Sequence, residues 1–62
     1  MIAKIWRNRI IGGTKTYAQC PASYKEDVLE LLKQDVVNET QTYLGKMTPE
    51  IFYELTGIEY EA

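Results

Sequence analysis

The 62-residue sequence contains no histidine and only one cysteine. The absence of histidine removes the usual general base of enzymes, and with it the Ser-His-Asp triad and the Cys-His pair. One cysteine cannot close an intrachain disulfide, and without histidine it cannot complete an ordinary structural zinc site. We therefore expect a protein that is not an enzyme and that holds no cofactor and no metal.

Long apolar runs are also missing. No stretch approaches the roughly 18 apolar residues needed to cross a bilayer, and charges scattered through the first residues argue against a cleaved secretory signal. We therefore expect no membrane span and a cytoplasmic location. Residues 1–62 fit a single domain. A domain this short buries only about 60% of its unfolded surface, so self-association is the expected source of further stability.

The charged residues are unevenly divided along the chain. Residues 1–25 carry five basic and no acidic side chains, whereas the remainder carries nine acidic and two basic ones, which leaves a net charge of −2. This division favours packing of the basic end against the acidic end, within one chain or between chains. Basic side chains beside Trp6 would suit phosphates or a membrane surface. However, a pI near 4.9 is not that of a dedicated DNA-binding domain, so nucleic acid is not the partner we expect.

The first predicted helix covers about residues 2–11. Ile2, Ile5, Trp6 and Ile10 fall on one helical face, and Gly12-Gly13 supplies a place for the helix to end. The alternative is a β-hairpin that turns at the two glycines. Three consecutive polar residues at positions 7–9 interrupt the alternation that a strand requires, so the helix is favoured.

A long second helix is predicted over about residues 23–44. Ser23 and Glu26 have the spacing of a capping box, and Gly45 could adopt the left-handed conformation after the last turn. The β-branched and turn-prone residues at 37–40 have low helix propensity. A hinge near residues 37–40 therefore stays open as an alternative to one continuous helix.

The third predicted helix covers about residues 49–56. Thr48 can cap its start, and Pro49 suits the first helical position because its missing amide is harmless there. Met47 and Phe52 have the spacing of a hydrophobic staple across this start.

The end of the third helix is also specified by the sequence. Gly57 is expected in the left-handed conformation, with Ile58 folding back on Tyr53 in a Schellman ending. Three helices of these lengths predict an all-α fold in which a long central helix receives a short helix from each side.

Aromatic side chains are the candidate interface. A helix trio this small cannot cover all of its rings, and aromatic residues are enriched at the buried centres of protein contacts. We expect some of them to be shared with a second copy or exposed as a patch. The candidates are Trp6, Tyr17, Tyr24, Tyr43, Phe52, Tyr53 and Tyr60.

Three other patterns favour structure over chemistry. Cys20 is a possible nucleophile with no visible activating partner. Glu26, Asp27 and Glu30 could surround a divalent cation, but any acidic helix start has this pattern. The glycine-threonine segment at residues 12–16 has the wrong glycine spacing for a phosphate-binding loop, and a helix stop explains it better.

The chain resembles two groups of short phage proteins. Its tail, GKMTPEIFYELTGIEYEA, is similar to the ending of phage and prophage proteins of the XkdX type. The matching residues are Gly45-Lys46-Met47-Thr48, Glu50, Leu55-Thr56-Gly57 and Glu59-Tyr60. The front is similar to another group of very short prophage proteins through Gly13-Thr14-Lys15-Thr16 and Cys20-Pro21. The resemblance implies a gene among late tail and lysis genes, and it carries over no catalytic residue.

The function that we expect is binding without catalysis. A homo-oligomeric phage or prophage protein would act through protein contacts, as a minor tail component or a small assembly factor for phage tail proteins. It would be found in the host cytoplasm or in the virion. The alternative is a cytoplasmic inhibitor or regulator that binds a host enzyme or nucleic acid, with its acidic half imitating phosphate charge. The oligomer count and the partner are left open.

Overall fold

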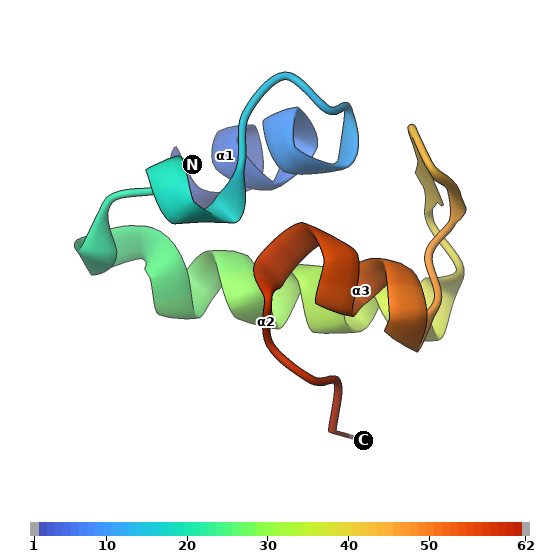
Figure 1. The fold of residues 1–62 in the computed structure, drawn as a ribbon. Coiled ribbons are helices and arrows are strands. Elements are labelled where there is room, and N and C mark those ends of the chain that lie inside the picture. Colours follow the sequence, from blue (N-terminus) through green and yellow to red (C-terminus); the bar gives the residue numbers. More distant parts are fainter. Residues whose placement is uncertain (1, 62) are drawn as a thin grey trace.

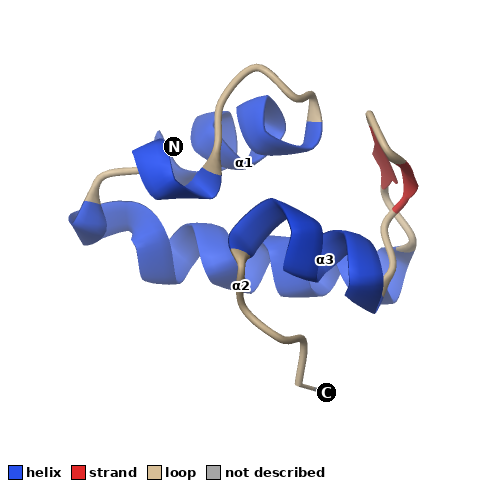
Figure 2. Ribbon diagram, in the orientation of Figure 1, coloured by secondary structure: helices blue, strands red, loops and turns tan. Residues whose placement is uncertain are grey.

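The computed structural model describes residues 2–61 and is mostly helical (Figure 1). The predicted domain of residues 1–62 extends past this range at residues 1 and 62, which lie outside the described residues. The elements are α1 (Ile2–Ile11), the short 3₁₀ helix η1 (Tyr17–Gln19), α2 (Ala22–Asn38), β1 (Gln41–Thr42), β2 (Gly45–Lys46) and α3 (Pro49–Thr56). Both α1 and α3 pack against α2, as predicted. The fold is not purely all-α, because β1 and β2 form a small antiparallel sheet (Figure 2).

The core lies where the three helices meet, and it is small. Among residues 2–61, eight apolar side chains are buried in one cluster. They are Ala3, Ile10, Tyr17, Cys20, Val28, Leu32, Met47 and Phe52. Within residues 2–61, no helix is long and apolar enough to span a bilayer.

Helix α1 has the predicted bounds but buries a different face. Ala3 and Ile10 are buried, whereas Ile2 and Ile5 are each 49% exposed. The predicted apolar face was therefore confirmed for Ile10 and in part for Trp6, and it was wrong for Ile2 and Ile5. The buried face contains Ala3 in the first turn and Ile10 in the last, and α1 packs against α2. Gly13 follows with a φ of 82°, the expected left-handed stop.

Helix α2 begins without the predicted capping box. It begins at Ala22 after Pro21, no side chain caps it, and Ser23 lies inside the helix. A capping box occurs instead at η1, where the Thr16 hydroxyl accepts the Gln19 N–H and the Gln19 side chain accepts the Thr16 N–H. The fixed φ of Pro21 favours a helix start directly after it, before Ser23 can act.

Helix α2 also ends earlier than residue 44. It ends at Asn38, and Glu39 takes the left-handed conformation with a φ of 52° and a ψ of 43°. The Thr40 amide then bonds back to the Asp35 carbonyl at 3.0 Å. The continuous helix was wrong, and the break near residues 37–40 is what the chain adopts, because this segment has low helix propensity.

A tight hairpin replaces the last predicted turns of α2. Gln41 pairs with Lys46 and Thr42 with Gly45. The buried Thr42 hydroxyl donates to the Gly45 carbonyl at 2.7 Å and accepts the Leu44 N–H at 3.1 Å, which closes the turn. Gly45, with a φ of 117°, serves this turn and does not end a helix.

The hairpin is tied to the end of α1. The Tyr43 amide donates to the Ile11 carbonyl at 2.8 Å, which satisfies one of the open carbonyls at that helix end. The Tyr43 ring covers Gly13 so closely that a Cβ on this glycine would lie 3.0 Å from the ring. Figure 1 shows the hairpin standing beside the C-terminal end of α2.

Helix α3 has the predicted bounds and the predicted start. The Thr48 hydroxyl accepts the Ile51 N–H at 3.2 Å, and Pro49 occupies the first turn. Met47 and Phe52, the expected staple, are both buried in the core.

Helix α3 ends at a left-handed glycine, with one correction. Gly57 has a φ of 73° and its amide bonds to the Tyr53 carbonyl at 2.7 Å. The Ile58 amide bonds to the Thr56 hydroxyl at 3.1 Å and does not reach back as a Schellman ending requires. The ending is the simpler left-handed motif, because the Thr56 hydroxyl takes this amide.

Candidate functional site

The predicted interface aromatics are divided between core and surface. Tyr17 and Phe52 are buried and close the core. Trp6, Tyr24 and Tyr60 are half-buried against it. Tyr43 is 58% exposed and Tyr53 is 51% exposed. Of the seven candidates, only these last two residues are more than half exposed. They lie on the hairpin and on α3, respectively.

Tyr17 connects η1 to the start of α2. Its hydroxyl donates to the Lys25 carbonyl at 3.2 Å, and the Lys25 ammonium lies 5.4 Å from the centre of the ring. Burial raises the pKa of the Tyr17 hydroxyl, and the nearby Cys20 and Glu26 raise it further. These contacts fix η1 onto the start of α2.

The surroundings of Cys20 do not favour a reactive thiol. It is buried in the core, and its thiol lies 3.6 Å from the Pro21 carbonyl. Burial raises the pKa of the thiol, and the charge of Lys25 only partly opposes this. A thiol that stays protonated and covered is a weak nucleophile.

The candidate cation ligands do not converge. Among residues 2–61, no three acidic or cysteine side chains are grouped closely enough to hold a metal ion. Asp27 and Glu30 instead line a hollow of about 230 Å³ between α1 and α2, together with Ala3, Lys4 and Leu31.

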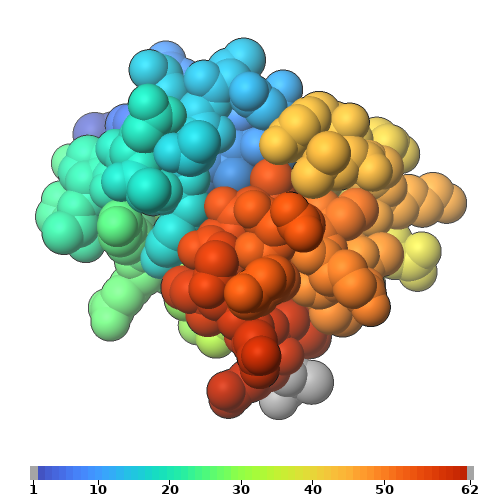
Figure 3. Space-filling view, in the orientation of Figure 1, coloured from blue at the N-terminus to red at the C-terminus, as the bar shows by residue number. Residues whose placement is uncertain are grey.

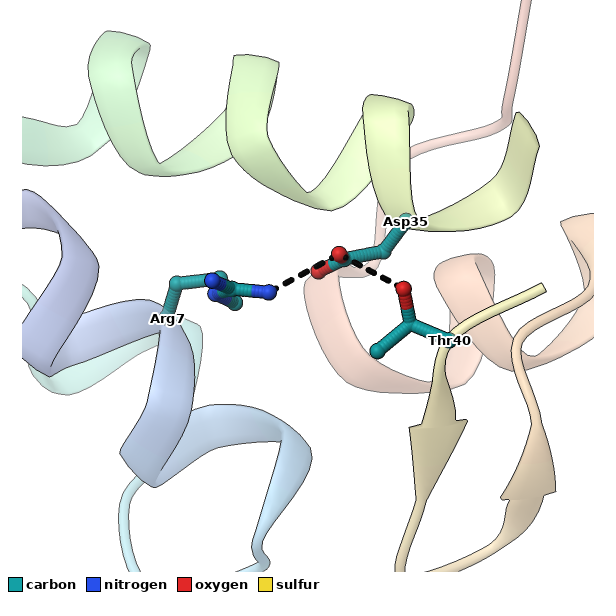
Figure 4. Close-up of polar contacts among 3 residues, drawn as sticks. All are labelled: Arg7, Asp35 and Thr40. Carbon is teal, nitrogen blue, oxygen red and sulfur yellow. Dashed lines mark hydrogen bonds and ion pairs between the residues drawn. The ribbon is translucent and has the colours of Figure 1, made fainter. Parts of the chain in front are cut away.

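One ion pair joins the basic and acidic parts of the chain (Figure 4). Arg7 of α1 donates to Asp35 Oδ1 near the end of α2 at 2.9 Å, and the Thr40 hydroxyl donates to the same oxygen at 3.0 Å. The Asp35 side chain is only 5% exposed. Within residues 2–61 this is the sole ion pair, so the expected packing of basic against acidic segments is made once inside the chain.

A second hollow lies between α3 and the segment that follows it. We call it the acidic hollow. It has a volume of about 460 Å³ and is lined by Pro49, Glu50, Tyr53, Glu54, Glu59 and Tyr60. The Tyr60 ring is held edge-on against the buried Phe52, with ring centres 5.5 Å apart and planes at 75°. The hollow therefore has a fixed aromatic wall and three carboxylates, none of which is paired with a lysine or arginine of residues 2–61.

The exposed face of α1 is the second surface with unused contacts. Ile2, Ile5 and Arg9 follow one another at spacings of three and four, so they lie on one face, and all three are exposed. We call these residues the α1 strip. Arg9 has no acidic partner among residues 2–61. Both surfaces combine apolar atoms with charge, as the rims of protein interfaces do.

The two surfaces belong to different helices and share no residue. In Figure 1 α3 is the nearest helix, whereas α1 lies above it in the view and is drawn fainter. Figure 3 shows residues of α3 and the following segment, in orange and red, forming the near lower surface. The three residues of the α1 strip are exposed and none of them lines the acidic hollow, so one copy does not place its own strip in its own hollow.

Sequence reasoning did not predict the acidic hollow or the α1 strip, although the residues that form them could be read from the sequence. The aromatic surplus at positions 53 and 60 was noted without the three glutamates beside it. Their spacing in residues 50–59 was a usable signal, since positions 50 and 54 lie one helical turn apart. Comparison with known proteins gave no match to a family model, to a curated protein or to a solved structure.

Proposed function

We propose that this protein is a non-catalytic phage or prophage protein that acts through protein–protein contacts as a homo-oligomer. It would work in the host cytoplasm, as a small assembly factor for tail proteins, or in the virion as a minor tail component. The observation that carries the proposal is the number of large apolar side chains left outside a core of eight. Ile2, Ile5, Val37, Tyr43, Leu44, Tyr53 and Ile58 are all exposed to 39% or more.

These exposed side chains support binding because they are placed in groups. Ile2 and Ile5 share α1, Tyr43 and Leu44 form the tip of the hairpin, and Tyr53 and Ile58 lie on or just after α3. A single exposed apolar residue needs no explanation, but apolar pairs beside charged groups are typical of contact surfaces.

The proposed absence of catalysis has a separate support. The side chain with the most nucleophilic chemistry, Cys20, is covered by the core and has no activating base. Replacing Cys20 by Ser should leave phage yield unchanged. A loss of yield with unchanged folding would contradict the non-catalytic proposal.

The phage context is supported by the resemblance of residues 45–60 to XkdX-type proteins. The capping residues of α3 account for part of this sequence pattern by themselves. The phage context is therefore tested by an experiment in cells. The protein, tagged and produced in cells that assemble the phage, should co-purify with tail proteins. A tail component would also be found in purified virions, whereas an assembly factor would be found only with tail intermediates.

A cytoplasmic inhibitor or regulator is the second candidate. It is favoured by the acidic hollow, whose outward carboxylates could imitate phosphate charge toward a host enzyme that binds nucleic acid. In the same co-purification, such a regulator would be recovered with a host protein and with no tail protein. That result would contradict the tail-associated function.

A further inference from the structure

We propose that the acidic hollow of one copy is occupied by the α1 strip of a second copy. The inference rests on the proposed function, because it names the surfaces through which the protein contacts itself. It concerns Ile2, Ile5 and Arg9 on one side and the tyrosine and glutamate lining of the hollow on the other.

Charge complementarity is the first argument. Glu50, Glu54 and Glu59 line the hollow without a cationic partner from residues 2–61, and Arg9 is exposed without an anionic one. An arginine placed there would form charge-assisted hydrogen bonds with a carboxylate. Its planar guanidinium could also lie against the face of Tyr53, where cation–π attraction adds to the contact.

The shape of the two surfaces is the second argument. The strip presents two isoleucines and then an arginine along one face of a ten-residue helix, which is the spacing used when a helix binds in a groove. The hollow offers apolar atoms of Pro49 and two tyrosines in its wall, with carboxylates around them. The Tyr60 ring is already fixed by Phe52, so little ordering is required on binding.

A second copy fits these surfaces better than the other occupants. The three glutamates do not converge as metal ligands, and an ion would make no use of the rings. All three strip residues are exposed and none of them lines the hollow of its own copy, so the proposed contact is between copies. If two copies are related by a twofold axis, each gives its strip and receives its partner's, which closes the assembly as a dimer.

The contact is small, and it should be weak. One short helix in a shallow hollow falls below the roughly 1,200 Å² that stable interfaces bury, so we expect a dissociation constant on the order of 10–100 μM. The full chain should therefore be studied by sedimentation equilibrium from about 1 μM to about 1 mM.

The decisive experiment exchanges the charges across the proposed contact. Arg9→Glu and Glu54→Arg should each weaken self-association by about tenfold or more, and the double variant should recover most of the loss, because the pair is restored with reversed signs. Ile5→Ser should weaken association by removing an apolar contact, and it leaves every charge unchanged. Lys15→Glu, an equal charge change at an exposed loop position, is the matched control. Circular dichroism should show unchanged helix content in each variant.

Three outcomes would overturn the inference. The wild-type chain could stay monomeric up to about 1 mM, well above the expected dissociation constant. It could associate with an affinity that none of the strip or hollow variants changes, in which case another surface joins the copies. Finally, Glu54→Arg could abolish capture of a tail protein while self-association is unchanged, and the hollow would then serve a different protein. The last two results leave the proposed function intact, and failure to co-purify with tail proteins would contradict that function alone.

Discussion

At the scale of single residues, Asp35 is a buried charged side chain that holds distant parts of the chain together. It is buried, and its Oδ1 atom receives hydrogen bonds from α1 and from the segment before β1. Its Oδ2 atom and the Nε atom of Arg7 have no hydrogen-bond partner among residues 2–61. The carboxylate therefore joins three parts of the chain through one oxygen.

Replacing Asp35 by Asn should lower the free energy of unfolding by about 1–3 kcal/mol, because it removes the charge that compensates the Arg7 guanidinium. The loss is limited because the Arg7 side chain is 20% exposed and can be partly hydrated. Asp27→Asn on the exposed face of the same helix is the control. Urea unfolding followed by circular dichroism measures both. Equal effects of the two changes would show that the buried pair contributes nothing.

Cys20 predicts a pH dependence of stability. Burial holds its folded-state pKa above the ordinary value of 9.0. The unfolded chain therefore loses the thiol proton first as the pH rises, and the unfolded state is favoured. The free energy of unfolding should fall by less than about 1 kcal/mol between about pH 8 and about pH 9.5, and the stability is fully present at lower pH.

The Cys20→Ala variant supplies the comparison, since it has no thiol to titrate. Its free energy of unfolding should stay nearly constant over the same pH range, because the Tyr17 hydroxyl ionises only at still higher pH. Equal slopes for the two proteins would mean that Cys20 is not covered in solution.

At the scale of elements, the hairpin couples the ends of α1 and α2. Thr40 bonds to Asp35 of α2, and Tyr43 bonds to Ile11 and covers Gly13. Two-stranded hairpins are at best marginally stable by themselves. This one is held by its contacts to both helices, so disturbing either contact should be felt by all three elements.

Alanine substitutions at two glycines distinguish the cost of a left-handed backbone from the cost of a close contact with the Tyr43 ring. Gly57→Ala should cost about 1 kcal/mol, because its φ of 73° is left-handed but the space around it is open. Gly13→Ala should cost about 1 kcal/mol more, because its φ of 82° is similar and its Cβ would also meet the Tyr43 ring. Thermal unfolding measures the difference. Equal losses would mean that Tyr43 does not pack on Gly13.

The elements also show where sequence reasoning succeeds. The bounds of α1 and α3 were predicted because their ends are set by residues next to them, the glycines of one and Thr48, Pro49 and Gly57 of the other. The end of α2 was not, because a low-propensity segment permits both a helix and a turn. The turn is favoured by two bonds from Thr40 to Asp35, one to the backbone carbonyl and one to the carboxylate, and Arg7, 28 positions away from Asp35, holds the same carboxylate.

At the scale of the whole molecule, stability rests on few side chains. Domains of this size have small reserves, typically about 3–5 kcal/mol from a single core. Phe52 is the largest fully buried side chain, and it contacts Tyr60 as well as the central cluster. The next residue, Tyr53, is half exposed.

This contrast predicts that alanine substitutions at these two neighbouring positions lower the free energy of unfolding by very different amounts. Phe52→Ala should cost about 3–5 kcal/mol and leave the chain largely unfolded. Tyr53→Ala should cost less than about 1 kcal/mol when measured below the concentration of self-association. Circular dichroism of the two variants at the same dilution makes the comparison. A folded Phe52→Ala protein would show that the core extends beyond the described cluster.

The sequence predicted what type of residue would form the candidate site, but not which residues. A surplus of rings indicated that some would be exposed, but seven candidates could not be sorted by sequence, since Phe52 and Tyr53 are neighbours with opposite burial. Sequence reasoning did not find the α1 strip, because apolar residues on a helix are expected to face the core. Ile2 and Ile5 were expected on the covered face with Trp6 and Ile10, but that face is formed by Trp6 and Ile10 together with Ala3 and Arg7.

The sequence by itself determined the features that depend on near neighbours: the helical character, the bounds of α1 and α3, the stop at Gly13 and the cap at Thr48. Tertiary structure decided where α2 ends, which side of α1 is buried and which tyrosines face outward. The physical reason is one of range. Caps and glycine conformations are settled within a turn of chain, whereas burial and the Arg7–Asp35 pair depend on packing between segments that are distant in sequence.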